Sequence, residues 1–200
     1  MAAASAAVII VCIAGLSVWL LFTSEPYTLP PGQDPQLILP LYDYSHLNII
    51  QGYGQVSPDR FHPGFDFGVN DTTIIVASYD AYVTDISLWY NERGGHWQVN
   101  MDLKMNSQCR IRIAFESWAL NETYGQLQLE AINVTVGQRV SANQSLGMIL
   151  CHGSGAHIHF GLYYNDDYVC PYSYFTAEAK TVFEVLYSVC GNPPDDWCIT

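Results

Sequence analysis

Between residues 73 and 115 the sequence repeatedly alternates apolar and polar side chains. Four short segments rich in β-branched and aromatic residues span residues 73–77, 82–89, 97–103 and 109–115, separated by Gly, Asn and Asp. A period of two places successive side chains on opposite faces of a β-strand, and the intervening residues favour turns. The chain is therefore predicted to be mainly antiparallel β-sheet.

The length and composition suit one domain. Two hundred residues, half of them hydrophobic, can build one well-buried core but scarcely two. Residues 176–187 form the one persuasive helical segment, with Thr176 as the expected N-cap and Glu178 in the first turn. Residues 132–147 contain strand-like stretches around glycine turns, which predict a β-hairpin corner.

The N-terminal region differs in composition from the rest of the chain. Residues 2–22 are free of charge, and at about 1.5 Å per residue such a helix is just long enough to cross a hydrocarbon core of roughly 30 Å. We predict a signal anchor over residues 1–24, with a signal peptide cleaved near Thr23 or Ser24 as the alternative. Proline-rich residues 25–45 predict an extended linker. A main domain over 46–165 and a C-terminal helix with a Cys-bearing tail over 166–200 complete the expected organisation.

Sequons and cysteines favour an exported compartment. Four Asn-x-Ser/Thr sequons begin at Asn70, Asn121, Asn133 and Asn143, which predicts a glycoprotein. Outside the apolar segment lie five cysteines, at positions 109, 151, 170, 190 and 198, a number plausible for disulfides outside the cytosol. We expect a Cys190–Cys198 bridge and a protein that is extracellular or held at the cell surface.

The charge balance excludes some partners. The formal net charge is −12, and only seven Lys and Arg residues are available to form basic patches. Binding to nucleic acid or to an anionic membrane surface is therefore not expected. The expected contact with a membrane is through the N-terminal apolar segment.

Two short histidine motifs supply metal-ligand chemistry. One is His62-Pro-Gly-Phe-Asp66, in which a Pro-Gly turn lets His62 and Asp66 converge, and the other is His157-Ile-His159. On a strand, His157 and His159 point to the same face. Imidazoles and one carboxylate are the ligand types that bind a catalytic Zn2+ and leave a position for water, whose pKa falls toward about 7. The histidine left over can act as general base or stabilise the oxyanion, so a zinc hydrolase is predicted.

The order of several motifs resembles the lysostaphin-type (LytM-like) zinc endopeptidases, which cut peptide cross-links of bacterial cell walls. The resemblance runs from about residue 52 to 162 and includes Gly52-Tyr-Gly, His62-Pro-Gly-Phe-Asp66-Phe, Val76-Ala, Ala81-Tyr-Val83, Val136-Gly-Gln-Arg-Val140, Leu146-Gly147 and Gly155-Ala-His-Ile-His-Phe160. It implies an all-β fold, an antiparallel β-sandwich, here with an added C-terminal helix. It also implies that His62, Asp66 and His159 hold one zinc ion while His157 assists catalysis.

One position departs from the family pattern. The family carries a second catalytic histidine in the strand before the long hairpin, and Ser117 in the matching stretch 115–118 stands where it is expected. A serine donates a hydrogen bond but cannot carry a positive charge beside a developing oxyanion, so some transition-state stabilisation should be lost. Ser117 itself, Glu116 or His152 is the expected substitute.

Two functions follow as expectations. The first is a zinc metalloendopeptidase that hydrolyses peptide bonds, in peptidoglycan cross-links or in Gly-rich peptides. The second, motivated by Ser117, is a catalytically weak or silent zinc-binding member that acts as a wall- or peptide-binding module.

Overall fold

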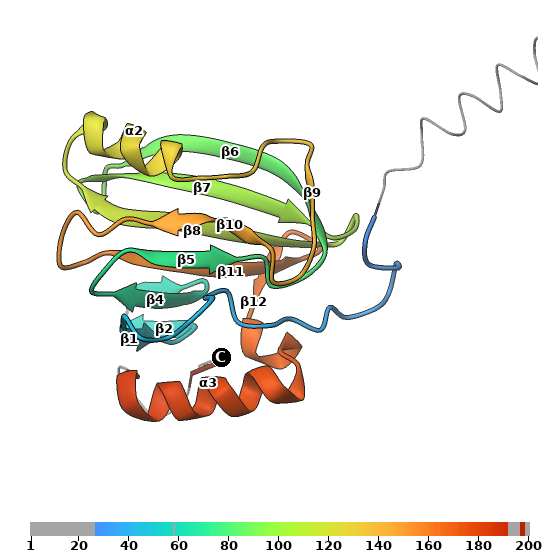
Figure 1. Ribbon diagram of the computed structural model, residues 1–200. Coiled ribbons are helices and arrows are strands. Elements are labelled where there is room, and N and C mark those ends of the chain that lie inside the picture. The colour runs from blue at the N-terminus through green and yellow to red at the C-terminus, as the bar shows by residue number, and fades with distance from the viewer. Residues whose placement is uncertain (1–26, 58, 192–196, 199–200) are drawn as a thin grey trace, which may run out of the picture.

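An antiparallel sheet forms the body of the molecule in the computed structural model, which describes residues 27–57, 59–191 and 197–198 (Figure 1). Its strand order is β1-β4-β11-β8-β7-β6-β9, with β12 paired to β11. The bounds are β1 Leu47–Gln51, β4 Phe65–Val69, β6 Ala81–Asn91, β7 His96–Lys104, β8 Cys109–Ala119, β9 Arg139–Val140, β11 His157–Tyr164 and β12 Asp167–Val169. The predicted anchor segment, residues 1–24, lies outside the described residues.

Shorter elements surround this sheet. β2 (Gly54–Ser57) pairs with β3 (Arg60–His62), and β5 (Thr73–Val76) pairs with β10 (Ser145–Ile149). Two helices, α2 (Glu122–Glu130) and α3 (Ala177–Cys190), lie at opposite ends of the view in Figure 1, and the 3-10 turn η1 (Pro171–Tyr174) precedes α3. The predicted fold class, mainly antiparallel β with an added C-terminal helix, is confirmed.

The main sheet has one buried face and one open face. In β11, Ile158 and Phe160 are fully buried, whereas His157 and His159 are only partly buried. Phe65 and Phe67 of β4 are buried in the same core, to which β5 and β10 contribute from a second layer (Figure 1). The period of two thus places the core on one side and leaves the histidines of β11 on the other.

The proline-rich segment is extended but is not a separate linker. Its leucines are buried in the core, namely Leu29, Leu37, Leu39 and Leu41. The backbone N–H of Ile38 donates to Ser78 O at 3.0 Å, and that of Tyr42 donates to Ile74 O at 3.1 Å. The prediction of a linker over 25–45 is corrected for residues 29–41, because alternate leucines bury one side of this extended chain.

The predicted hairpin corner is also corrected. β9 pairs with β6 in the main sheet, whereas β10 pairs with β5 in the second layer, so the two strands do not pair with each other. At the intervening turn Asn143 has a left-handed φ of 66°, and its N–H donates to Ala77 O at 2.8 Å. This turn carries the chain from one layer to the other.

The C-terminal helix begins as predicted. The Thr176 hydroxyl oxygen accepts a hydrogen bond from Ala179 N at 3.1 Å, and the helix runs to Cys190. The disulfide joins Cys170 to Cys198, so the predicted Cys190–Cys198 bridge is wrong. α3 directs Cys190 toward β1, where its Sγ lies 3.8 Å from Leu47 O.

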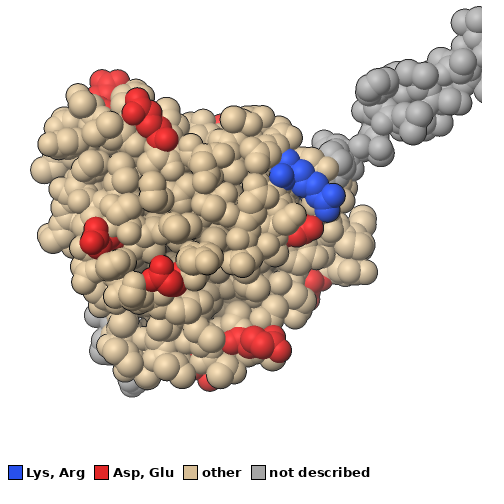
Figure 2. Space-filling view, viewed as in Figure 1, with Lys and Arg blue, Asp and Glu red and all other residues tan. Residues whose placement is uncertain are grey.

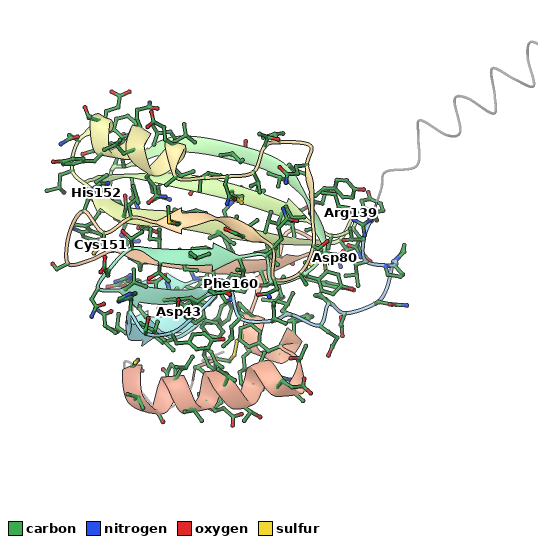
Figure 3. The ribbon with its side chains drawn as sticks, viewed as in Figure 1. Asp43, Asp80, Arg139, Cys151, His152 and Phe160 are labelled. Atoms are coloured by element: carbon green, nitrogen blue, oxygen red, sulfur yellow. A yellow bond between two sulfur atoms is a disulfide. The ribbon has the colours of Figure 1, made fainter. Side chains whose placement is uncertain are left out.

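The charged residues on the face seen in Figure 2 are sparse. Acidic side chains are scattered over it, and basic side chains are confined to one area. Arg139 there forms an ion pair with Asp80 at 3.3 Å (Figure 3). Within the described ranges, we find no helix with the length and apolar character required to cross a membrane.

Candidate metal centre

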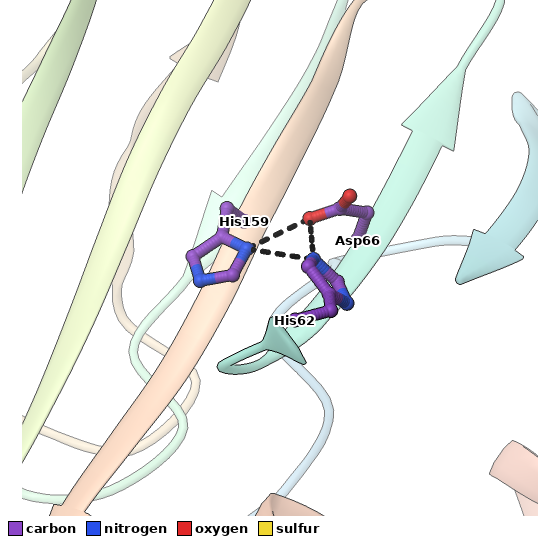
Figure 4. Close-up of side chains that lie close together, drawn as sticks. All are labelled: His62, Asp66 and His159. Atoms are coloured by element: carbon purple, nitrogen blue, oxygen red, sulfur yellow. Dashed lines mark hydrogen bonds and ion pairs between the residues drawn. The ribbon is translucent and has the colours of Figure 1, made fainter. Parts of the chain in front are cut away.

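Three side chains from the two histidine motifs converge on the open face of the sheet (Figure 4). His62 Nε2 lies 3.0 Å from Asp66 Oδ1 and 3.2 Å from His159 Nδ1, and the latter two atoms are 2.8 Å apart. Asp66 and His159 face each other directly across β4 and β11. His62 reaches them from β3 through the Pro-Gly turn. The structure thus brings the three predicted zinc ligands together.

Gly64 permits this close approach. A Cβ at position 64 would lie 2.5 Å from the carbonyl oxygen of Phe160 and 2.9 Å from the ring of His159. Any larger residue would push the turn away from β11. The glycine in the first motif is therefore required for the two motifs to meet.

Backbone contacts orient His62 for metal binding. The carbonyl oxygen of Gly52 can only accept, so His62 Nδ1–H donates to it at 2.6 Å and the Nε2 lone pair faces Asp66 and His159. The next residue, Tyr53, donates its N–H to Trp197 O at 2.8 Å. The C-terminal tail thereby supports the loop that orients this ligand.

The charges of the three side chains fit a cation. Burial alone would raise the pKa of Asp66, but the adjacent imidazoles of His159 and His62 hold it well below its usual range. Burial acts to lower the pKa of His62. The interaction with Asp66 outweighs burial, so the pKa of His62 is raised. The 2.8–3.2 Å separations approach the edge of about 3.3 Å expected between ligands of a tetrahedral zinc ion. Two imidazole nitrogens and one carboxylate oxygen with this spacing fit Zn2+.

His157 lies beside this group on the same strand. Its Nδ1–H donates to Gly155 O at 2.7 Å, which directs Nε2 toward Asp66 Oδ1 at 3.8 Å and Glu116 Oε1 at 3.6 Å. Burial would lower the pKa of His157, whereas Glu116 and Asp66 raise it to about 9. His157 is therefore placed to donate a hydrogen bond or a proton into the site.

Glu116, not Ser117, is the residue of β8 that faces the site. Glu116 pairs directly with His157 across β8 and β11, so the two side chains share the open face. Ser117 is completely buried on the other face, and its hydroxyl has no hydrogen-bond partner. The predicted catalytic role of Ser117 is corrected, because strand alternation turns it into the core.

A β-bulge sets this arrangement. Trp97 pairs with Ala119 and Val99 pairs with Phe115, so three residues of β8 oppose one residue of β7. Within the bulge Trp118 has a left-handed φ of 61°. Bulges near functional sites commonly redirect side chains, and this one has no signal in the period-two pattern.

His96 is the residue that sequence reasoning missed. It is 1% exposed, and its Nε2 lies 2.8 Å from Glu116 Oε2. Its ring stacks on Trp118 with centroids 4.5 Å apart. Burial alone would raise the pKa of Glu116, but the neighbouring imidazoles of His157 and His96 lower it to about 2. The available signal was a histidine that opens a strand directly after Gly94-Gly95.

His152 lies elsewhere. Its ring stacks on Tyr124 of α2, and it lines a separate pocket with Cys151 (Figure 3). The structure does not bring it together with the candidate ligands, so its predicted role as a substitute is corrected. The loop that carries it turns its side chain toward α2.

The candidate ligands lie in a cleft that continues on both sides. A cavity of about 450 Å³ contains all three, together with His157, Glu116 and His96. A second depression shares Glu116 and His159 with the first and extends to Trp89 and Tyr168. The open face of the sheet thus carries a groove that passes through the candidate metal centre.

No protein-family model and no curated protein matches this sequence. Among solved structures, a chain of the SpoIIQ–SpoIIIAH pore-forming complex is similar over 76% of this chain and 97% of its own, with a TM-score of 0.53 and 12% identity. Helicobacter pylori Csd3 is similar over 75% of this chain and 38% of its own, with a TM-score of 0.50 and 20% identity. The M23 protein EnpA of Enterococcus faecalis has a TM-score of 0.48 and 18% identity over 67% of this chain and 95% of its own.

This chain therefore spans well under half the length of Csd3. The likenesses at TM-scores of 0.50 and 0.53 are likenesses of fold. Asp66 and His159 lie on the adjacent strands β4 and β11 of the main sheet, whereas His62 lies on β3 of the separate β2–β3 pair. The chain shares its fold with Csd3 and with the chain of the SpoIIQ–SpoIIIAH complex.

Proposed function

We propose that this chain is a zinc-dependent metalloendopeptidase. The observation that carries the proposal is the convergence of His62 Nε2, Asp66 Oδ1 and His159 Nδ1 within 4.8 Å of one another on the floor of an open groove. Three protein ligands with room for water are typical of catalytic zinc sites, whereas structural sites use four. The proposal includes one zinc ion per chain.

The side chains around the ligands provide the remaining functions of a peptide hydrolase. Zinc bound by the three ligands would supply an acidified water and polarise the substrate carbonyl. His157 Nε2 lies at the edge of the ligand group, where it can donate to an oxygen that becomes negatively charged. Because the groove continues on both sides of the ligands, a substrate chain can extend in both directions. This favours internal cleavage over removal of terminal residues.

The substrate class follows from the motif resemblance. We propose peptide bonds of peptidoglycan cross-links or of Gly-rich peptides. A site outside the cytoplasm agrees with the Cys170–Cys198 disulfide and with the exposed asparagines of all four sequons. The apolar segment 2–22 would anchor the protein, or would be removed on secretion.

The test compares two histidine variants. The wild-type protein should contain about one zinc per chain and cleave pentaglycine or purified cell wall. His159→Ala should lose zinc and hydrolysis, whereas His46→Ala, which changes a histidine outside the groove, should retain both. Folded, zinc-loaded wild-type protein that cleaves none of these substrates would contradict the proposal.

A silent zinc-binding module is the second candidate. It is favoured by the absence of a second catalytic histidine from the described part of β8, where Glu116 is the side chain that lies opposite His157. Such a module would bind zinc and cell-wall peptide without cleavage. Its distinguishing result is an inactive wild-type protein that gains hydrolysis in Glu116→His.

A further inference from the structure

Glu116 and His96 form a polar pair beside the candidate zinc ligands that the three-ligand arrangement does not explain. His96 is among the most deeply buried polar residues of the described chain, at 1% exposure. It lies on β7, two strands away from β11. A buried imidazole is costly unless its hydrogen bonds serve the structure or the site.

The two oxygens of Glu116 have different surroundings. Oε2 lies 2.8 Å from His96 Nε2, a full hydrogen bond. Oε1 lies 3.6 Å from His157 Nε2, which is too long for one. The hydrogen bond to His96 therefore fixes Oε2. Oε1 remains available as an acceptor in the cleft that contains the three ligands.

His96 is held so that it can only act through Nε2. Its Nδ1 is buried and has no hydrogen-bond partner. The uncharged Nε2–H form donates to Glu116 and leaves a lone pair, not a donor, unpaired on Nδ1. The ring is clamped against Trp118, whose left-handed backbone lies in the β8 bulge. Strained backbone beside a cleft is expected where geometry has a functional role.

We propose that Glu116 is a catalytic residue of this site that transfers the proton during peptide hydrolysis, and that His96 is its positioning residue. This inference rests on the proposed peptidase function. Glu116 Oε1 accepts one proton from the attacking water as the water oxygen bonds to the peptide carbonyl carbon. The carbon–nitrogen bond then breaks, the same proton passes to the departing amine nitrogen, and Glu116 returns to its carboxylate form.

Glu116→Gln and His96→Phe test the two roles. Glu116→Gln keeps the shape but cannot take the proton, so kcat should fall about 10²–10⁴-fold with little change in KM. His96→Phe keeps an aromatic ring against Trp118 but frees Glu116, and kcat should fall about 10²-fold. His96→Gln restores an N–H donor and should recover part of that loss. Ser117→Ala changes the adjacent core-facing residue and is the matched control.

Two measurements separate catalysis from folding and metal loss. Zinc content should stay at the wild-type level in all four variants, because the ligands are untouched. In metal-free protein, nitrogen-15 NMR should show a slowly exchanging Nε2–H of His96, shifted downfield by the carboxylate and lost from that position in Glu116→Ala. The second measurement requires no enzymatic activity.

The outcomes are distinguishable. Near-wild-type kcat in Glu116→Gln, or an unchanged His96 signal in Glu116→Ala, would overturn this inference while leaving the peptidase proposal intact. Complete absence of hydrolysis by folded, zinc-loaded wild-type protein would overturn both. A loss in Ser117→Ala equal to that in Glu116→Gln would show that disruption of the bulge, rather than proton transfer, causes the effect.

Discussion

Glu116 links the stability of the metal-free protein to pH. Its pKa falls from 4.5 to about 2 on folding, so ionised Glu116 stabilises the fold above about pH 4.5, and this contribution disappears as the pH falls toward 2. The shift corresponds to at most roughly 3 kcal/mol. We expect urea unfolding to show a stability gap between wild type and Glu116→Gln that is largest near neutral pH and closes between about pH 4.5 and 2. A gap of constant size over that range would contradict this.

Gly64 should be intolerant of substitution. In Gly64→Ala the new methyl group would meet the backbone carbonyl of Phe160 at 2.5 Å, which cannot move without disturbing His159. We expect a loss of about 1–3 kcal/mol of unfolding free energy together with weaker zinc binding. Gly161→Ala is the control, because a methyl group there makes only ordinary contacts at 3.4 Å or more. Equal effects of the two substitutions on zinc affinity would contradict the proposed role of the turn.

At the scale of elements, the strands of the main sheet could be predicted and the bulge could not. Apolar and polar side chains alternate in residues 97–103 and 109–115, which is the pattern of a half-buried strand. The structure extends both segments by a few residues. The bulge depends on pairing between β7 and β8, which no local pattern encodes. Ser117 was proposed from the motif resemblance, although the alternation along β8 turns it into the core. The contact of His96 with Glu116 joins two strands whose pairing no local pattern predicts.

Of the two helices α2 and α3, only α3 could be predicted from local sequence signals. α3 has a capping threonine and an apolar stripe, and both are local signals. α2 was not predicted, because its apolar residues follow no clear helical face. Its position depends on contacts with residues that are distant in the sequence. Gly125 of α2, for example, lies so close to Trp97 that a Cβ would approach the tryptophan side chain to 2.8 Å.

The cap of α3 offers a test at this scale. Thr176→Ala removes the acceptor for Ala179 N–H, so we expect a loss of about 1 kcal/mol of unfolding free energy. Thr181→Ala, inside the same helix and exposed, should change stability by less than half of that. Thermal unfolding of the two variants measures both, and indistinguishable melting temperatures would contradict the cap.

At the scale of the whole molecule, the disulfide connects the C-terminal tail to the metal centre. Cys170–Cys198 closes a separation of 28 residues, which in the chain-entropy model stabilises the fold by about 3.6 kcal/mol. The tail also supports the loop whose Gly52 carbonyl orients His62. Loss of an outer contact of a metal ligand typically weakens metal affinity by about 10–100-fold.

We therefore expect the Cys170→Ser, Cys198→Ser double variant to unfold more easily and to bind zinc up to about tenfold more weakly. Cys109→Ser changes a buried thiol that is not in a disulfide and controls for the loss of cysteine itself. Competition with a chelator measures the affinity. Unchanged zinc affinity in a destabilised double variant would show that the tail supports the fold but not the ligand.

The central claim is that His62, Asp66 and His159 bind a single zinc ion in an open groove. Anomalous diffraction at the zinc edge from crystals of the zinc-loaded protein tests it most directly. The account predicts one strong peak within about 2.0–2.2 Å of His62 Nε2, Asp66 Oδ1 and His159 Nδ1, with a fourth position open to solvent. A peak bound by other residues, or no peak at these three side chains, would contradict it.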